Sequence, residues 1–136
     1  LFRRNVMAYN NSVTNTAGQL SAITATIAYT DSSAVTIGTI PANAQIVDIN
    51  IDVTTAFNAG TTNTVTVGKT GSAAAYVTST SVGSAGRASV ATTGVYSAWA
   101  NVGTSDIDYA TVTFSQTGTA ASAGAARVTI VYKSFA

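Results

Sequence analysis

The sequence predicts an all-β fold, an antiparallel β-sandwich of the jelly-roll type with about eight strands. Apolar and polar residues alternate with period two in short stretches, and clusters of Gly, Asn, Asp and Ser separate these stretches. Val, Ile and Thr abound, Glu is absent, and no window has the apolar spacing and caps of an amphipathic helix. Cysteine is absent as well, so the paired cysteines typical of immunoglobulin domains are missing and a jelly roll is preferred.

The alternation is clearest in residues 45–54. The apolar residues from Val47 to Val53 occupy every odd position and are expected to face the core. Asp48, Asn50 and Asp52 occupy the even positions and are expected to face solvent. The pattern therefore predicts a strand with one buried face and one solvent-exposed face.

Two strands are expected before this one. Residues 21–30 place apolar side chains, ending with Tyr29, on one face, and residues 30–33 then turn the chain into a second strand at 34–40. Pro41 ends this second strand because proline has no N–H group to donate to a strand ladder.

The remaining strands follow the same alternation. Residues 58–62 carry turn chemistry before a strand at 65–68, and residues 75–82 and 88–92 alternate weakly on either side of a small-residue loop at 83–86. Residues 95–100 contain Trp99, the single tryptophan. Alternating apolar residues predict the last two strands around Val112 and Ile130, with a glycine-rich loop at 118–124 between them.

Residues 1–19 differ from the rest of the chain in their pattern of apolar and polar residues. Residues 1–19 lack sustained alternation and contain two adjacent arginines, so we expect an extended N-terminal arm. Residues 20–136 are expected to form a single β-sandwich domain, because 136 residues suffice for one core and no linker divides them. Phe2, Arg3 and Arg4 on the arm are candidates for contact with a partner.

The charge composition narrows the class of partner. Charged residues make up only 8% of the chain, against about a quarter in ordinary globular domains, and the net charge is +1. No basic face is available for phosphates, so nucleic-acid binding is disfavoured. The sequence contains no run of about 18 apolar residues, so no membrane-spanning helix is predicted. The surface is predicted to be polar but uncharged, and such a surface repels copies of itself only weakly.

The residue inventory argues against an enzyme. His, Cys and Glu are all absent, which removes the usual general base, the reactive thiol and the commonest metal ligands. Only five aspartates remain for acid–base chemistry. We therefore predict a structural or binding protein with no catalytic residues and no cofactor.

Two pairs of aspartates are candidate cation ligands. Asp48 and Asp52 share a strand face and supply oxygen ligands of the kind that Ca²⁺ prefers, and Asp106 and Asp108 form a second pair. The preferred interpretation is a solvent-facing strand for the first pair and turn residues for the second, so no metal site is predicted.

Aromatic residues suggest a further binding surface. Trp99, Tyr96, Tyr76, Tyr109 and Phe57 are candidates for a sugar-binding platform. The preferred interpretation divides them between the core and an interface. Trp99 is retained as a candidate for contact with a partner.

One segment carries a family resemblance. The sequences IPANA at residues 40–44 and VDINIDVTTAFNAGTTNTVTVG at residues 47–68 resemble small β-rich virion proteins of tailed bacteriophages, including head decoration, or cement, proteins. The resemblance implies a virion protein on the capsid surface. It would bind the major capsid protein and copies of itself, as a dimer or trimer, and stabilise contacts between capsomers without catalysis.

Two alternatives remain open at this point. A carbohydrate- or receptor-binding module of a phage fibre would use the same sandwich with exposed aromatic residues, and a glycan would then be its ligand. A capsid subunit would also use a sandwich that assembles.

Overall fold

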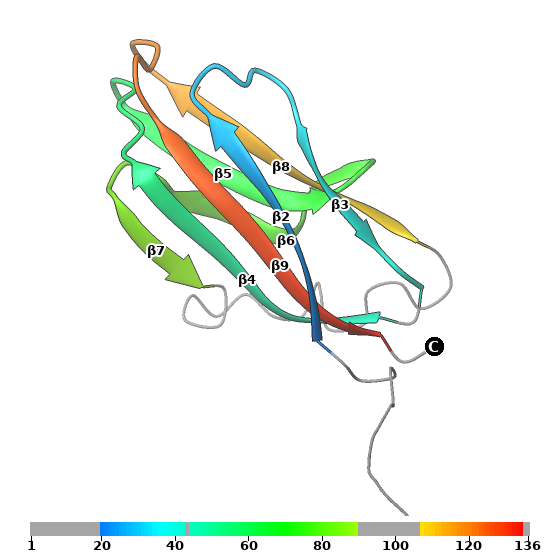
Figure 1. Cartoon of the computed structure of the whole chain (residues 1–136). Helices are drawn as coiled ribbons and strands as arrows, with labels where there is room; N and C mark the ends of the chain where they lie inside the picture. Colours follow the sequence, from blue (N-terminus) through cyan, green and yellow to red (C-terminus); the bar gives the residue numbers. More distant parts are fainter. Residues whose placement is uncertain (1–19, 43, 90–106, 135–136) are drawn as a thin grey trace, which may run out of the picture.

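Eight antiparallel strands form two four-stranded sheets in the computed structural model, which describes residues 20–42, 44–89 and 107–134 (Figure 1). The strands are β2 (Leu20–Ala28), β3 (Val35–Ile40), β4 (Ala44–Thr55), β5 (Thr62–Lys69), β6 (Ser72–Ser81), β7 (Gly86–Ser89), β8 (Asp108–Thr117) and β9 (Ala125–Ser134). No helix occurs in these residues, and so none that is long and apolar enough to span a lipid bilayer.

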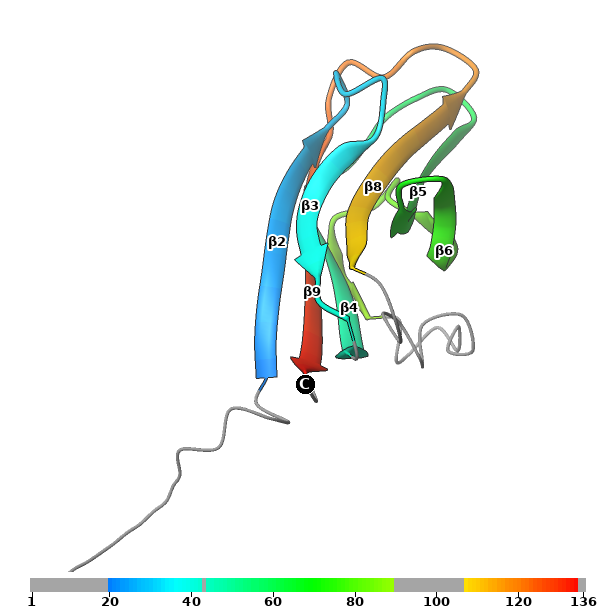
Figure 2. The ribbon, with the colours of Figure 1, turned by 90° about the vertical axis from the view of Figure 1, so that its right-hand side faces the viewer.

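The strand order is that of a jelly roll. One sheet has the order β2-β9-β4-β7 and the other has the order β3-β8-β5-β6. Counted along the described chain, the first sheet contains strands one, eight, three and six, and the second contains two, seven, four and five. The two sheets lie face to face (Figure 2), which confirms the predicted antiparallel β-sandwich.

The core lies between the two sheets. The first sheet contributes the inward-facing Ile and Val residues of β4 and β9, and the second contributes those of β5 and β8. Ile49, Ile130 and Val112 have no exposed surface. At about 25 cal/mol per Å² of buried apolar surface, such side chains are the main source of stability in a chain without disulfides.

The predicted faces of β4 are correct except at Val47. Ile49, Ile51 and Val53 are buried as expected, whereas Val47 is 39% exposed and its neighbour Ile46 is buried. The pairing of β4 with β9 shifts register between Ile46 and Asp48. This β-bulge inserts one extra residue and reverses the alternation, so the prediction that Val47 faces the core was wrong.

The first two strands also end differently from the prediction. Tyr29 was expected on the inner face, but β2 ends at Ala28 and Tyr29 is 36% exposed in the turn. In β3 the pairing with β8 shifts between Thr36 and Gly38. This irregularity allows Ile37 and Ile40, three positions apart, to be buried together.

A loop cluster closes the end of the sandwich at which β4 and β8 end. Phe57, in the loop after β4, is 1% exposed and packs on Phe114 with the ring centroids 4.6 Å apart. Asn58 ties this loop to residues 118–124, because its Oδ1 accepts hydrogen bonds from the backbone N–H groups of Ser122 (2.8 Å) and Ala123 (3.0 Å). Residues 118–124 form the loop expected from their glycine content.

Some predicted elements are only partly covered. The strand expected at 88–92 corresponds to β7, which begins at Gly86, and residues 90–92 lie outside the described residues. The stretch at 95–100 and the arm at 1–19 also lie outside them.

Candidate functional site

The partner-contact residues predicted from the sequence lie outside the part of the chain that the structure describes. Phe2, Arg3, Arg4 and Trp99 all belong to this group. Their role in partner contact stays a prediction.

The polar residues of β4 form a hydrogen-bonded line along the strand. The Nδ2 group of Asn50 donates to Asp48 Oδ2 at 3.0 Å, and the backbone N–H of Ile49 donates to Asp48 Oδ1 at 2.9 Å. On its other side, Asn50 Oδ1 accepts a hydrogen bond of 3.0 Å from Nε of Arg87. The amide of Asn50 is thus fixed between an acidic and a basic partner.

This geometry suits a solvent-facing strand better than a calcium site. Asn50 turns its N–H group, not its oxygen, toward Asp48, and an N–H group does not bind a cation. Asp52 Oδ2 is paired with Arg127 at 3.1 Å, so a guanidinium already occupies the place that a cation would take. Within the described residues, no three Asp, Glu, His or Cys side chains cluster to hold a metal. Asp106 lies outside these residues.

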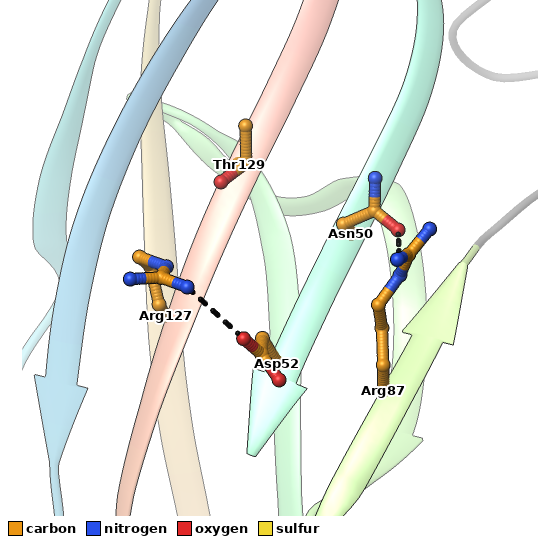
Figure 3. A pocket seen from close by; sticks show the side chains of 5 residues that line it. All are labelled: Asn50, Asp52, Arg87, Arg127 and Thr129. Carbon is orange, nitrogen blue, oxygen red and sulfur yellow. Dashed lines mark hydrogen bonds and ion pairs between the residues drawn. The ribbon is translucent and has the colours of Figure 1, made fainter. Parts of the chain in front are cut away.

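Two arginines flank Asp52 across the sheet. In the strand register Asp52 is opposite Arg127 on β9 and opposite Arg87 on β7, so the three residues form one row across three strands. Together with Asn50 and Thr129 they line a hollow of about 230 Å³ on the outer face of the sheet (Figure 3). We call this site the arginine hollow.

Charge is distributed unequally between the two sheets. The strands of the first sheet carry five charged residues, namely Asp48, Asp52, Arg87, Arg127 and Lys133. The strands of the second sheet carry only Lys69 and Asp108, each at the end of a strand. The sandwich therefore has one charged face and one nearly uncharged face.

The uncharged outer face is built from hydroxyl side chains on β5 and β8. Three cross-strand pairs form it, which are Thr62 with Thr117, Thr64 with Ser115 and Thr66 with Thr113. The hydroxyls of Thr62 and Thr117 are 2.6 Å apart and share a hydrogen bond. We call these six residues the threonine face. These hydroxyl side chains make the face polar without charge, although the Oγ1 of Thr113 is itself buried.

Exposed apolar side chains gather at one end of the sandwich. Leu20 (57% exposed), Val47 (39%), Ile107 (51%) and Tyr109 (55%) lie at or near the beginnings of β2, β4 and β8. In Figure 1 these strands begin at the lower end, where β9 also ends. We call these four residues the apolar end. Tyr29 is the remaining large exposed apolar residue of the described chain and lies at the opposite end.

The structure describes three of the five residues of the candidate aromatic platform. Phe57 and Tyr76 are each 1% exposed and belong to the core, whereas Tyr109 is exposed at the apolar end. Tyr96 and Trp99 lie outside the described residues. In the described chain, then, no group of exposed aromatic rings forms a platform.

Sequence reasoning did not identify Arg87 and Arg127 as a pair. They lie 40 positions apart on β7 and β9, and only the strand order brings both beside Asp52. The scarcity of charged residues is the one sequence feature that could have drawn attention to these two arginines. Of the four basic residues in the described chain, two meet in one hollow.

Comparisons with known proteins establish the fold. The sequence matches no protein-family model, and no curated protein matches it. Among solved structures, the chain is similar to one in the capsid asymmetric unit of cyanophage Pam1, with a TM-score of 0.64 and 17% sequence identity. The similarity covers 89% of each chain. The two chains therefore share a fold over almost their whole lengths.

Proposed function

We propose that this protein is a non-catalytic structural protein of a bacteriophage particle, and more specifically a capsid decoration protein. In this role it binds the outside of the head as a homo-oligomer and stabilises contacts between capsomers. The observation that carries the proposal is the fold shared with a chain of a phage capsid asymmetric unit. The similarity covers the same share of both chains, so the two compared chains are of similar length.

The distribution of side chains supports an assembly role. Four of the five large apolar side chains that are exposed in the described chain, Leu20, Val47, Ile107 and Tyr109, lie at the apolar end, so we place an assembly contact there. Residues 1–19, the predicted arm, precede Leu20 in the chain, and Leu20 lies at this end. We assign the contact with neighbouring copies and with the major capsid protein to the apolar end, together with Phe2, Arg3 and Arg4 of the arm and Trp99.

Such a contact depends little on ionic strength. The residues of the apolar end are uncharged, and dissolved salt screens charge–charge attraction without weakening the burial of apolar surface. Many copies on one particle add their separate contacts, so each contact can be individually weak.

Solution mass tests the oligomeric part of the proposal. The purified full chain should form a discrete dimer or trimer whose sedimentation mass is the same at low salt and at about 0.5 M salt. Leu20→Ser combined with Tyr109→Ser should give monomers that keep the wild-type circular dichroism spectrum. Tyr29→Ser, which removes an exposed ring at the opposite end, is the matched control and should leave the oligomer intact. Closed shells from the isolated chain would instead identify a capsid subunit.

Imaging of the native particle tests the location. Density for the sandwich is expected on the outer surface of the head, and density at a fibre tip would contradict the decoration role. A glycan array gives an independent readout, because glycan binding that disappears in Trp99→Ala would favour the fibre module. Deletion of residues 1–19 should reduce binding to heads without lowering the melting temperature of the sandwich.

A further inference from the structure

We propose that the arginine hollow is a binding site for an acidic saccharide, a sugar that carries a carboxylate as well as hydroxyl groups. The site lies on the charged outer face of the β2-β9-β4-β7 sheet, at the opposite end of β4 and β9 from Val47 and Lys133. It requires neither the arm nor the apolar end, so the inference stands or fails independently of the decoration role.

The side chains of the hollow are held in place before any ligand arrives. Arg127 donates to Asp52 Oδ2 at 3.1 Å, and Arg87 donates through Nε to Asn50 Oδ1 at 3.0 Å. The hydroxyl of Thr129 lies 3.1 Å from the hydroxyl of Thr24 and shares a hydrogen bond with it. Because these contacts restrain the side chains, a ligand meets groups that have already lost part of their rotational freedom.

The remaining hydrogen-bonding groups define the ligand. Within the described residues, each guanidinium uses one of its five N–H groups in a hydrogen bond, so both arginines retain donors for a carboxylate. Two guanidinium cations and one carboxylate give the lining side chains a net positive charge, and the remaining guanidinium donors attract an anionic group. The Asp48 carboxylate, which accepts a hydrogen bond from Asn50, lies beside the hollow and reduces this attraction.

Asp52 determines which kind of anion fits. One of its oxygens is paired with Arg127, and a carboxylate oxygen accepts hydrogen bonds but never donates. An acidic amino-acid side chain meets the arginines well but brings like charge against Asp52 and offers it no donor. A sugar acid brings a carboxylate for the arginines and hydroxyl donors for Asp52 and Thr129. The mixed donors and acceptors of the hollow favour the sugar acid.

The size and openness of the hollow agree with this assignment. Its volume is about 230 Å³, well above the roughly 10–15 Å³ of probe volume that a single water molecule needs. The hollow therefore accommodates a group of several heavy atoms, not a single ion. Arg127 and Asp52 keep 58% and 38% of their side-chain surface exposed, so one site binds weakly. A polymer of acidic sugars compensates for this by engaging many copies of the protein at once.

Titration of the full chain with trigalacturonate tests the assignment. The probe carries carboxylates and hydroxyls, and its methyl ester has the same rings without the charges. NMR shifts of the Arg87 and Arg127 Nε–H signals should saturate with a Kd in the range of about 1 mM for trigalacturonate, and the methyl ester should not bind. Arg127→Gln and Arg87→Gln should each weaken binding about tenfold, the effect of losing one charge-assisted hydrogen bond. Binding should also fall as salt is added.

Lys133→Gln is the matched control, because it removes the same charge from the same sheet outside the hollow. It should leave the affinity within about twofold, and a loss equal to that of Arg127→Gln would overturn the site in favour of unspecific attraction. If the methyl ester bound as tightly as trigalacturonate, the arginines would not be binding the carboxylates and the proposal would be overturned. Tighter binding of a hexaglutamate peptide would overturn the saccharide in favour of an acidic protein. Absence of shifts at about 10 mM trigalacturonate would overturn the proposal altogether.

Discussion

Replacing Gly124 with alanine tests the packing of the loop cluster most directly. Gly124 precedes β9 and has a φ of +149°, and an added Cβ would lie 2.4 Å from Cδ2 of the Phe57 ring. The ring cannot retreat easily, because Phe57 is 1% exposed and packs against Phe114. Two costs are therefore expected, one from the backbone conformation and one from the steric clash.

The backbone cost can be measured separately. Gly86 has a φ of +134°, and no atom lies within 4 Å of its would-be Cβ, so Gly86→Ala isolates the cost of the conformation. We expect about 1–2 kcal/mol for Gly86→Ala. An overpacked core adds about 1–3 kcal/mol, which gives Gly124→Ala a total of about 2–5 kcal/mol, centred on about 3.5 kcal/mol. At about 3 °C per kcal/mol, the melting temperature should fall by about 10 °C.

Urea unfolding of a double-mutant cycle separates the two costs. In a Phe57→Ala background the ring is gone, so Gly124→Ala should cost no more than Gly86→Ala does in the intact chain. The coupling free energy is then about 2 kcal/mol, at an unchanged m-value. Additive costs for Phe57→Ala and Gly124→Ala would refute the steric argument, as would equal costs for the two glycine substitutions.

Three further predictions concern polar groups. The Oγ1 of Thr113 is buried without a hydrogen-bond partner in the described structure, so Thr113→Val should stabilise the protein by about 1 kcal/mol in urea unfolding; destabilisation would mean that the hydroxyl has a partner. Asn58→Ala removes three hydrogen bonds and should cost about 2 kcal/mol, whereas Ser122→Ala removes one and should cost less than about 1 kcal/mol; equal losses would contradict the assignment of Asn58 as the residue that ties the loop cluster together. Calcium should leave the melting temperature unchanged within about 1 °C, and a rise that a chelator reverses would show that Asp48 and Asp52 bind the ion after all.

The sequence predicted the fold because alternation survives in most strands. Every second residue is apolar and buried in residues 49–53 of β4, residues 110–114 of β8 and residues 126–130 of β9. The prediction failed where a bulge changes the phase. Ile46 and Val47 are adjacent and both apolar, so the pattern alone does not reveal which of them faces inward.

The arginine hollow was not predictable in the same way. Asp52 was recognised as a solvent-facing residue of β4, but its neighbours come from strands encoded far away in the chain. Arg87 is on a four-residue strand that alternates too weakly to reveal its register from sequence. Strand order is a property of the whole topology, and local pattern carries little information about it.

The central position of β9 determines when this protein can fold during its synthesis. β9 is the last strand of the described chain, yet it lies between β2 and β4 and hydrogen-bonds along both. Thr24 on β2 bonds to the carbonyl of Val128, 104 positions later. The ribosome therefore completes β2, β4 and β7 before β9 exists. The inward-facing Ile residues of β2 and the Ile and Val residues of β4 then lack the strand that lies between them. Such long-range pairing forms slowly, so we expect these apolar faces to be most exposed to aggregation in the interval before β9 has been synthesised.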